Sequence, residues 1–204
     1  MIAIDTYIEG FSTKINQYQK EPWELVQNLD TIIRDMIAEL DDDFVIENDI
    51  AIHKTAQIES NVILKGPLII GKHCFIGANS YLRNGVILDE AARVGTSCEI
   101  KSTIIFDHSA VAHFNFIGDS IIGSRVNFEA GSITANHFNE RDNKTIYVLY
   151  DAELINTDVH KFGALIGDDS KIGANAVLSP GTLLSKKSIV KRLELVEQVR
   201  GNSS

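Results

Sequence analysis

Residues 70–81 read IGKHCFIGANSY, two consecutive six-residue units that each begin with isoleucine followed by glycine. Outward from this stretch, an aliphatic residue recurs at every sixth position from Ile52 to Ile100, and a mostly small or apolar residue stands four positions after each one. An α-helix has a period of about 3.6 residues and an amphipathic strand a period of about two, so neither explains the pattern. A fixed repeat of this kind is typical of solenoids.

The six-residue unit also predicts the shape of the solenoid. Two inward positions in every six residues describe one short flat side of a prism, and three such sides close a coil of eighteen residues. Neighbouring coils would pair through backbone hydrogen bonds at a spacing of about 4.8 Å. We therefore expect an all-β fold, a single-stranded parallel β-helix of hexapeptide repeats.

The repeat is interrupted in three places. It slips by one residue after Ile100 and again after Ile117, and it stops for a long insertion at about residues 135–165. The insertion contains the apolar run TIYVLY at residues 145–150, so we expect part of it to pack. Insertions in solenoids leave from a corner and often carry the functional site. We divide the chain into a helical segment (1–50), a β-helix (51–192) and a C-terminal tail (193–204).

The segment before the repeats has a helical pattern. Pro22 stands where a first helical residue would, and the acidic run 41–43 is expected to end the helix. The apolar residues at helical spacing are Leu25, Val26, Leu29, Ile32, Ile33, Met36, Ile37 and Leu40. We expect this stripe to pack against the solenoid or a neighbouring subunit, and to shield the first open coil.

Composition excludes several classes of protein. Of the 204 residues 44% are hydrophobic and 23% charged, and the net charge of −9 argues against nucleic acid or an anionic membrane as the main partner. No signal peptide and no apolar run long enough to span a bilayer is evident. Cys74 and Cys98 occupy small inward positions, and we interpret them as reduced core thiols of a cytoplasmic protein.

The repeats resemble those of the hexapeptide acyltransferase superfamily, whose members form left-handed β-helices and are usually trimers. The left hand is implied by this resemblance alone, because the general rule for crossovers favours the right hand. Longer motifs resemble the acetyltransferase half of the bifunctional N-acetylglucosamine-1-phosphate uridyltransferases. They are YLR at 81–83, EIKST at 99–103, AHFNFIGD at 112–119 and VNFEAGSITAN at 126–136. The motif FGALIGDD at 162–169 and the insertion before it are more similar to the archaeal type.

This resemblance implies roles for particular residues. His113 matches the family's general base, and Arg83 and Lys101 match the groups that hold the sugar phosphate. Asn127 matches a sugar contact, and Asn136 matches the asparagine near the amine and the acyl group. The resemblance therefore implies acetyl transfer from acetyl-coenzyme A to an amino-sugar phosphate, within a homotrimer.

The remaining matches include departures from the family. Ala130 and Ala174 fall where the family lines the acetyl-coenzyme A path. Phe116 stands where the family usually has a tyrosine that contacts the sugar, and His137 replaces a second aromatic residue. Lys144 is the nearest counterpart of the family's loop lysine. No glycine-rich nucleotide-binding segment is evident in the sequence, so we do not expect a pyrophosphorylase half within these residues.

The same residues can be interpreted from their chemistry. Arg83 and Lys101 are eighteen residues apart, which places them in one column on adjacent coils. Like charges stacked at about 5 Å repel unless an anion lies across them, so the column is a candidate phosphate site. An imidazole such as His113 can accept the proton as an amine attacks a thioester, which typically contributes about 10²–10⁴-fold to the rate.

Parts of the sequence also fit other functions. His73, His108 and His113 are similar to the zinc ligands of γ-class carbonic anhydrases, but the first two are expected to lie two coils, or about 10 Å, apart. That separation is awkward for a metal with bonds of about 2 Å, so we expect no metal. The alternatives left open are a non-catalytic sugar-nucleotide-binding or scaffold β-helix, favoured by Phe116, and an acyltransferase for a nucleotide-linked amino sugar.

The sequence thus predicts an N-acetyltransferase for glucosamine-1-phosphate or an isomer. Coenzyme A would follow the outer groove beside the later coils. Two interpretations of the basic residues there stay open, contact with its phosphates or a solvated basic tail, and the residues are Lys186, Lys187, Lys191 and Arg192. We also expect a homotrimer, because surplus apolar residues predict a buried exterior strip, for which the N-terminal helix is the alternative cover. The residues are Val62-Ile63, Leu68-Ile69, Val86-Ile87 and Ile121-Ile122.

Overall fold

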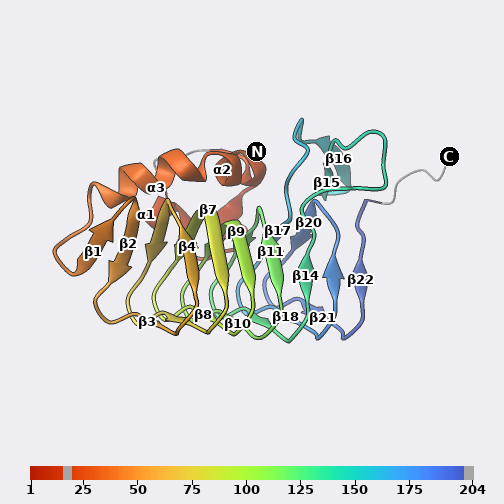
Figure 1. Ribbon diagram of the computed structural model, residues 1–204. Coiled ribbons are helices and arrows are strands. Elements are labelled where there is room, and N and C mark those ends of the chain that lie inside the picture. Colours follow the sequence, from red (N-terminus) through yellow and green to blue (C-terminus); the bar gives the residue numbers. More distant parts are fainter. Residues whose placement is uncertain (16–19, 200–204) are drawn as a thin grey trace.

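The computed structural model describes residues 1–15 and 20–199, in which short strands wind into a parallel β-solenoid (Figure 1). The first face consists of β2 (Ile50–His53), β5 (Leu68–Ile70), the second halves of β7 (Tyr81–Leu88) and β9 (Glu99–Ile105), β12 (Ile121–Ile122), β17 (Ala164–Ile166) and β20 (Thr182–Leu184). The second face consists of β3 (Gln57–Ile58), β6 (Phe75–Ile76), β8 (Arg93–Val94), β10 (Ala110–Val111), β13 (Asn127–Phe128), β18 (Lys171–Ile172) and β21 (Ile189–Val190). The third face consists of β4 (Ile63–Lys65), the first halves of β7 and β9, β11 (Phe116–Gly118), β14 (Ile133–Thr134), β19 (Val177–Leu178) and β22 (Leu195–Val196).

The register of the strands confirms the hexapeptide interpretation. Leu82 pairs with Ile100, eighteen residues later, whereas Leu88 pairs with Ile105, seventeen residues later. Ile105 in turn pairs with Ile122, so both one-residue slips lie at the turn from the third face to the first. The fold is that of a left-handed β-helix, as the resemblance implied. β22 continues the third face beyond residue 192.

The interior of the solenoid is a narrow apolar core. The repeated aliphatic residues, among them Ile70, Leu88 and Ile105, are completely buried, and Cys74 and Cys98 occupy inward positions as free thiols. Burial of one such aliphatic side chain contributes about 1.5–3 kcal/mol. Burial also raises the pKa of the Cys74 thiol to about 12.

The N-terminal segment contains η1 (Ile4–Thr6), α1 (Phe11–Ile15), α2 (Pro22–Gln27) and α3 (Leu29–Ile37). As predicted, Pro22 begins a helix, and reciprocal hydrogen bonds between Glu21 and Glu24 cap it. The chain breaks at Asn28, so the predicted stripe is divided between two helices. Figure 1 shows these helices lying along the first face rather than over its open end. Packing of the stripe on the solenoid is confirmed.

The helices form a second core outside the solenoid. The outward residues of the first face, such as Ile69, Ile87 and Ile104, are almost fully buried in one cluster with Leu29 and Ile33. Helix α3 contacts β5 and β7, and α2 contacts β9. The exterior strip predicted to be an intersubunit surface is therefore covered on this face by the chain's own helices. The strip predicted from Leu68-Ile69, Val86-Ile87 and Ile121-Ile122 is buried, and on this face the chain's own helices cover it, because periodicity alone does not specify which partner covers an outward residue.

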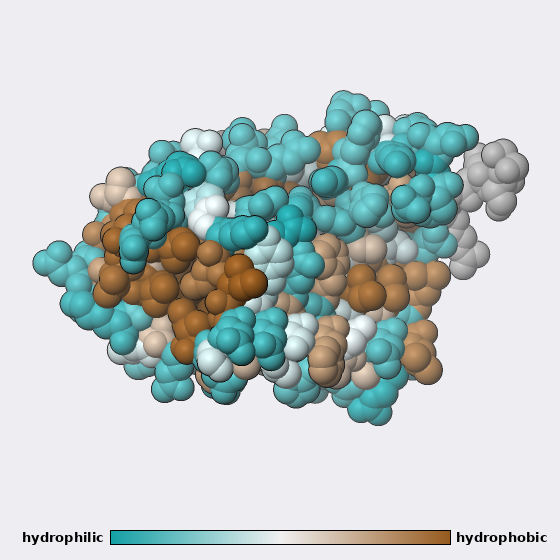
Figure 2. Space-filling model, viewed as in Figure 1, coloured by the Kyte–Doolittle hydropathy of each residue, from teal (hydrophilic) through white to brown (hydrophobic). Residues whose placement is uncertain are grey.

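The first coil ends in a strand instead of a helix. β1 (Phe44–Glu47) pairs antiparallel with β2, and Val45 and Ile46 on it are 60% and 47% exposed. Figure 2 shows a hydrophobic area over the end of the molecule where these strands lie. The prediction that the helical segment shields the first coil was therefore wrong, since the helices run along a side.

The insertion is folded, as its apolar run predicted. β15 (Tyr147–Tyr150) and β16 (Glu153–Asn156) form a hairpin, and Ile146 and Val148 are fully buried. The amide of Phe162 donates to the carbonyl of Asn136 at 3.0 Å, which joins the two ends of the insertion. The ring of Phe162 also lies edge-on to Trp23, with 5.9 Å between centroids.

Across residues 1–15 and 20–199, the helices are all too short or too polar to cross a lipid bilayer.

Candidate active site

The richest polar network lies at the turn from the third face to the first, which we call the Asp119 corner. Asn84, Ser102 and Asp119 follow the third-face strands of three successive coils, and each has a positive φ of 46–57°. Gly118 precedes Asp119, and a Cβ there would stand 2.8 Å from both the Phe116 ring and the Asn136 Nδ2 atom. Glycine at this position therefore allows the side chains of two coils to approach each other.

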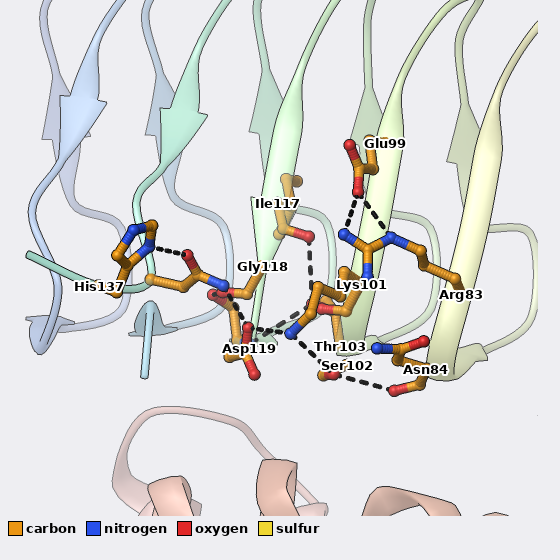
Figure 3. A network of polar contacts seen from close by, with 12 residues as sticks. Arg83, Asn84, Glu99, Lys101, Ser102, Thr103, Ile117, Gly118, Asp119 and His137 are labelled. Atoms are coloured by element: carbon orange, nitrogen blue, oxygen red, sulfur yellow. Dashed lines mark hydrogen bonds and ion pairs between the residues drawn. The ribbon is translucent and has the colours of Figure 1, made fainter. Parts of the chain in front are cut away.

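Lys101 and Asp119 form a buried ion pair at this corner (Figure 3). The Nζ atom of Lys101 lies 2.7 Å from Oδ2 of Asp119 and 3.3 Å from Oγ of Ser102. Lys101 and Asp119 are only 8% and 5% exposed. Buried charges of this kind persist only when they are paired and hydrogen-bonded, so the two residues depend on each other.

The network continues from Asp119 to the protein surface. The Nδ2 atom of Asn136 donates to Oδ2 of Asp119, and the Oδ1 atom of Asn136 lies 3.1 Å from Nδ1 of His137. Asn136 is 6% exposed, whereas the side chain of His137 is exposed. A continuous chain of polar contacts thus connects the buried lysine with an accessible imidazole.

Arg83 is ion-paired in a similar way. Its Nε and Nη2 atoms contact Oε1 of Glu99 at 2.8 and 2.7 Å, and its guanidinium lies 5.6 Å from the Tyr81 ring centroid. Arg83 and Lys101 are direct register partners, as their spacing predicted. However, each cation has its own carboxylate, so the repulsion that suggested an external anion is already relieved within the chain.

His113 is exposed at the turn from the second face to the third. Its carbonyl accepts hydrogen bonds from the backbone amide of Gly131 and from the side-chain Nδ2 of Asn115, but within the described residues its imidazole has no hydrogen-bond partner. Strand β11 separates it from the Asp119 corner. The structure therefore does not bring His113 together with Lys101 or Asn136 in one chain.

Of the three other predicted sugar contacts, two lie away from Asn136 and one lies beside it. Asn127 points outward from β13 on the second face, and Lys144 is exposed in the insertion. Phe116 lies half-buried on the outside of the third face, where it pairs in register with Glu99. A single chain therefore places Phe116 beside Asn136, whereas Asn127 and Lys144 lie elsewhere.

The two residues predicted to line the coenzyme A path lie on neighbouring coils. The amide of Asn175 donates to the carbonyl of Ala130 at 3.0 Å, and the amide of Ala174 donates to the Glu129 carboxylate at 2.9 Å. Glu129 also receives two hydrogen bonds from Arg192, which hold the pKa of its carboxyl below the usual value.

A groove of about 490 Å³ runs along the second face beside these residues. Its basic lining residues are Lys171, Lys191 and Arg192. Lys187 lines an adjoining hollow of about 560 Å³ together with Arg125 and Lys171. Lys186 lies 3.8 Å from the buried Asp168 carboxylate, which places it partly within the fold.

The three histidines of the rival metal site lie apart within one described chain. His73 and His108 occupy equivalent turns two coils apart, with Ala91 on the coil between them, and His113 lies at a different turn. Residues 1–15 and 20–199 contain no cluster of three or more metal-ligating side chains.

Sequence reasoning missed Glu99, Asp119 and the orientation of His137. The sequence did contain a signal for the Lys101–Asp119 ion pair, because Asp119 follows Lys101 by eighteen residues, which places it one coil later. The slip at the same corner hides this relation, since Lys101 pairs in register with Gly118. No sequence signal indicated that Asn136 would lie between Asp119 and His137.

The fold and its repeats define a hexapeptide-repeat β-helix protein. Residues 46–146 match the family described as GMPPB C-terminal domain, and residues 163–191 match the hexapeptide repeat of succinyl-transferase. Part of the chain is also similar to proteins named bifunctional protein GlmU. It is 35% identical over 83 residues to that of Methanococcus maripaludis, covering 41% of this chain and 20% of the relative. It is 40% identical over 81 residues to that of Methanococcus aeolicus, covering 40% of this chain and 19% of the relative.

An archaeal relative and a solved structure add to this comparison. The bifunctional sugar-1-phosphate nucleotidylyltransferase/acetyltransferase of Sulfurisphaera tokodaii is 36% identical over 73 residues, or 36% of this chain and 18% of the relative. The match therefore spans about a fifth of the length of these curated relatives. A hexapeptide transferase family protein from Anaplasma phagocytophilum aligns with 71% of this chain and 70% of its own, at 17% identity and a TM-score of 0.30.

Proposed function

We propose that this protein transfers an acetyl group from acetyl-coenzyme A to the amine of a hexosamine-1-phosphate. The observation that carries the proposal is the placement of Arg83, Lys101, Asp119 and Asn136 on four successive coils, at the same edge of the third face. These residues stand in motifs that resemble the acetyltransferase half of the uridyltransferases. The GlmU relatives support the same chemistry for this part of the chain.

The two predicted phosphate ligands take different roles in this proposal. Arg83 keeps its Nη1 atom available, because within the described residues only Nε and Nη2 contact Glu99. Arg83 is therefore the proposed phosphate ligand. Lys101 is buried and bonded to Asp119, so it chiefly fixes the corner on which the acceptor rests.

His113 is the proposed base that removes a proton as the amine attacks the thioester. Because His113 and Asn136 stand at opposite ends of the third face, a site that contains both requires a neighbouring chain. We propose a homotrimer in which third faces meet. The outward residues of this face include apolar side chains at Ile63, Tyr81, Phe116, Ile133, Val177 and Leu195. Ile63, Ile133 and Leu195 are 54%, 39% and 62% exposed, which supports a covering partner.

The groove beside Ala130 and Ala174 is the proposed path of coenzyme A. Its Lys171, Lys191 and Arg192 can neutralise phosphate groups, and its open shape suits an extended cofactor. Arg192 would have to exchange part of its contact with Glu129 for this purpose.

The decisive experiment measures thiol release from acetyl-coenzyme A against a panel of hexosamine-1-phosphates. We expect release with at least one of them. Release only with nucleotide-linked amino sugars would show that these, and not hexosamine-1-phosphates, are the substrates. Release with none would favour the non-catalytic sugar-binding alternative, which the replacement of a tyrosine by Phe116 and the internal pairing of both cations support.

A further inference from the structure

The contacts of Asn136 determine which nitrogen of His137 carries a hydrogen. The carboxylate of Asp119 can only accept, so the amide nitrogen of Asn136 faces it. The amide oxygen of Asn136 then faces Nδ1 of His137 at 3.1 Å. Since this oxygen can only accept, Nδ1 must donate. In the neutral ring the lone pair is therefore on Nε2.

This orientation is anchored in the protein core. Asp119 is fixed by its ion pair with Lys101, and its backbone nitrogen donates to the carbonyl of Lys101 at 2.8 Å. The carbonyl of Asn136 receives a hydrogen bond from the amide of Phe162. Asn136 is thus held through both its side chain and its backbone, whereas the ring of His137 remains exposed to solvent and ligands.

His113 differs from His137 in this respect. Within the described residues, no side chain or backbone group fixes the imidazole of His113, while the imidazole of His137 is held by a buried network (Figure 3). The two histidines also stand at opposite ends of the third face. They are suited to different proton transfers.

Acetylation of an amino sugar requires two proton acceptors in sequence. An aliphatic amine is mainly an ammonium ion at neutral pH and has no lone pair for attack. One proton must leave before the nitrogen bonds to the thioester carbon, and a second must leave as the amide forms. Overall, an ammonium ion and a thioester give an amide, a thiol and one free proton.

We propose that Nε2 of His137 removes the first proton from the acceptor's ammonium group, a role that rests on the acetyl transfer proposed above. The neutral amine then attacks the carbonyl carbon and forms the C–N bond. His113 takes the second proton, the C–S bond breaks, and the departing thiolate receives that proton. Exposed His137 returns its own proton to water. Asn136 and Asp119 are positioning residues in this scheme.

The kinetic test compares pH profiles of kcat/KM for His137→Asn and His108→Asn. Asparagine at position 137 keeps a donor toward Asn136 but removes the proton acceptor. We expect a loss of about tenfold or more at pH 7, shrinking to about threefold or less near pH 9.5, where a far larger fraction of the amine is neutral in solution. His108 is an exposed histidine at a distant turn, so its variant should match the wild type at both pH values. A pH-independent loss in His137→Asn, or no loss, would overturn the proposal.

A second test does not depend on turnover. Nitrogen-15 NMR of the histidine rings should show His137 as the Nδ1–H tautomer, which is the minor form of free histidine. Asn136→Ala should return His137 to the Nε2–H form, with the other histidines unchanged. An Nε2–H form in the wild type would contradict the geometry. The Nδ1–H form in a protein that acetylates no acceptor would refute the proposed function and the proton-removal role while leaving the relay intact.

Discussion

The first and third faces of this solenoid carry similar outward apolar columns but have opposite environments. On the first face, Ile104 is 1% exposed beneath the N-terminal helices. On the third face, Ile133 is 39% exposed with nothing over it in the described chain. The difference teaches that a hexapeptide pattern specifies which residues point inward, whereas the cover of an outward column depends on segments outside the repeat.

The largest expected effect is the difference in stability between variants of the two cations on the third face, Lys101 and Arg83. Lys101→Ala leaves Asp119 charged, buried and without its cation, so we expect a loss of about 3–5 kcal/mol in the free energy of unfolding. Arg83→Ala, with a partly exposed partner in Glu99, should cost about 1 kcal/mol or less. Instead it should raise KM for the sugar phosphate and barely change KM for acetyl-coenzyme A. Urea unfolding and steady-state kinetics measure both, and equal stabilities would contradict this contrast.

The next contrast tests the covered and uncovered columns directly. Ile104→Ala creates a cavity beneath the helices and should lower the free energy of unfolding by about 2–5 kcal/mol. Ile133→Ala, measured under conditions where the chain is monomeric, should change it by about 0.5 kcal/mol or less. Comparable losses for the two variants would show that the third face is also covered within one chain.

His113 stands at the edge of the uncovered face and should affect chemistry alone. We expect His113→Ala to lower turnover by about 10²-fold or more at every pH, with the fold unchanged. Circular dichroism provides the control for folding. Near-normal turnover in a folded variant would exclude His113 from the mechanism.

Assembly gives a smaller energetic effect but a clear readout. Sedimentation at micromolar concentration should show a homotrimer, and Ile133→Asp should shift it toward monomer with loss of activity. The helices on the first face leave that face unavailable, so a charge on the third face should suffice. A monodisperse wild-type monomer with full activity would refute the shared site.

The smallest effect concerns the interior common to both faces. The pKa of the Cys74 thiol is raised from 9.0 to about 12, mainly by burial. Between these values the unfolded chain loses a thiol proton that the folded chain keeps, so stability should fall as pH rises above 9. Below pH 9 both states keep the proton, so the contribution of the Cys74 thiol to the free energy of unfolding is fully present. Cys74→Ala should show a shallower alkaline decline in urea unfolding, and an identical decline would contradict the burial effect.

The predictable part of the structure is the part that repeats. Ile70, Leu88 and Ile105 reveal the coil because each obeys the same inward constraint. The helix that begins at Pro22 was also predictable, since proline marks its start and the apolar stripe marks its packing face. The partners of Lys101 and Arg83 were not predictable from period alone. Asp119 and Glu99 neutralise these cations because their side chains turn toward them, and the direction of a side chain depends on atomic packing.

The hydrogen bond between Phe162 and Asn136 has a consequence for how this protein can diversify. It closes residues 137–161 into an excursion that departs and returns at one point on the solenoid. The entropic cost of a longer loop grows only slowly with its length. Hairpins of other lengths can therefore be grafted there without shifting the coils on either side. The excursion is thus a position at which the chain can vary in length while the repeating scaffold stays constant.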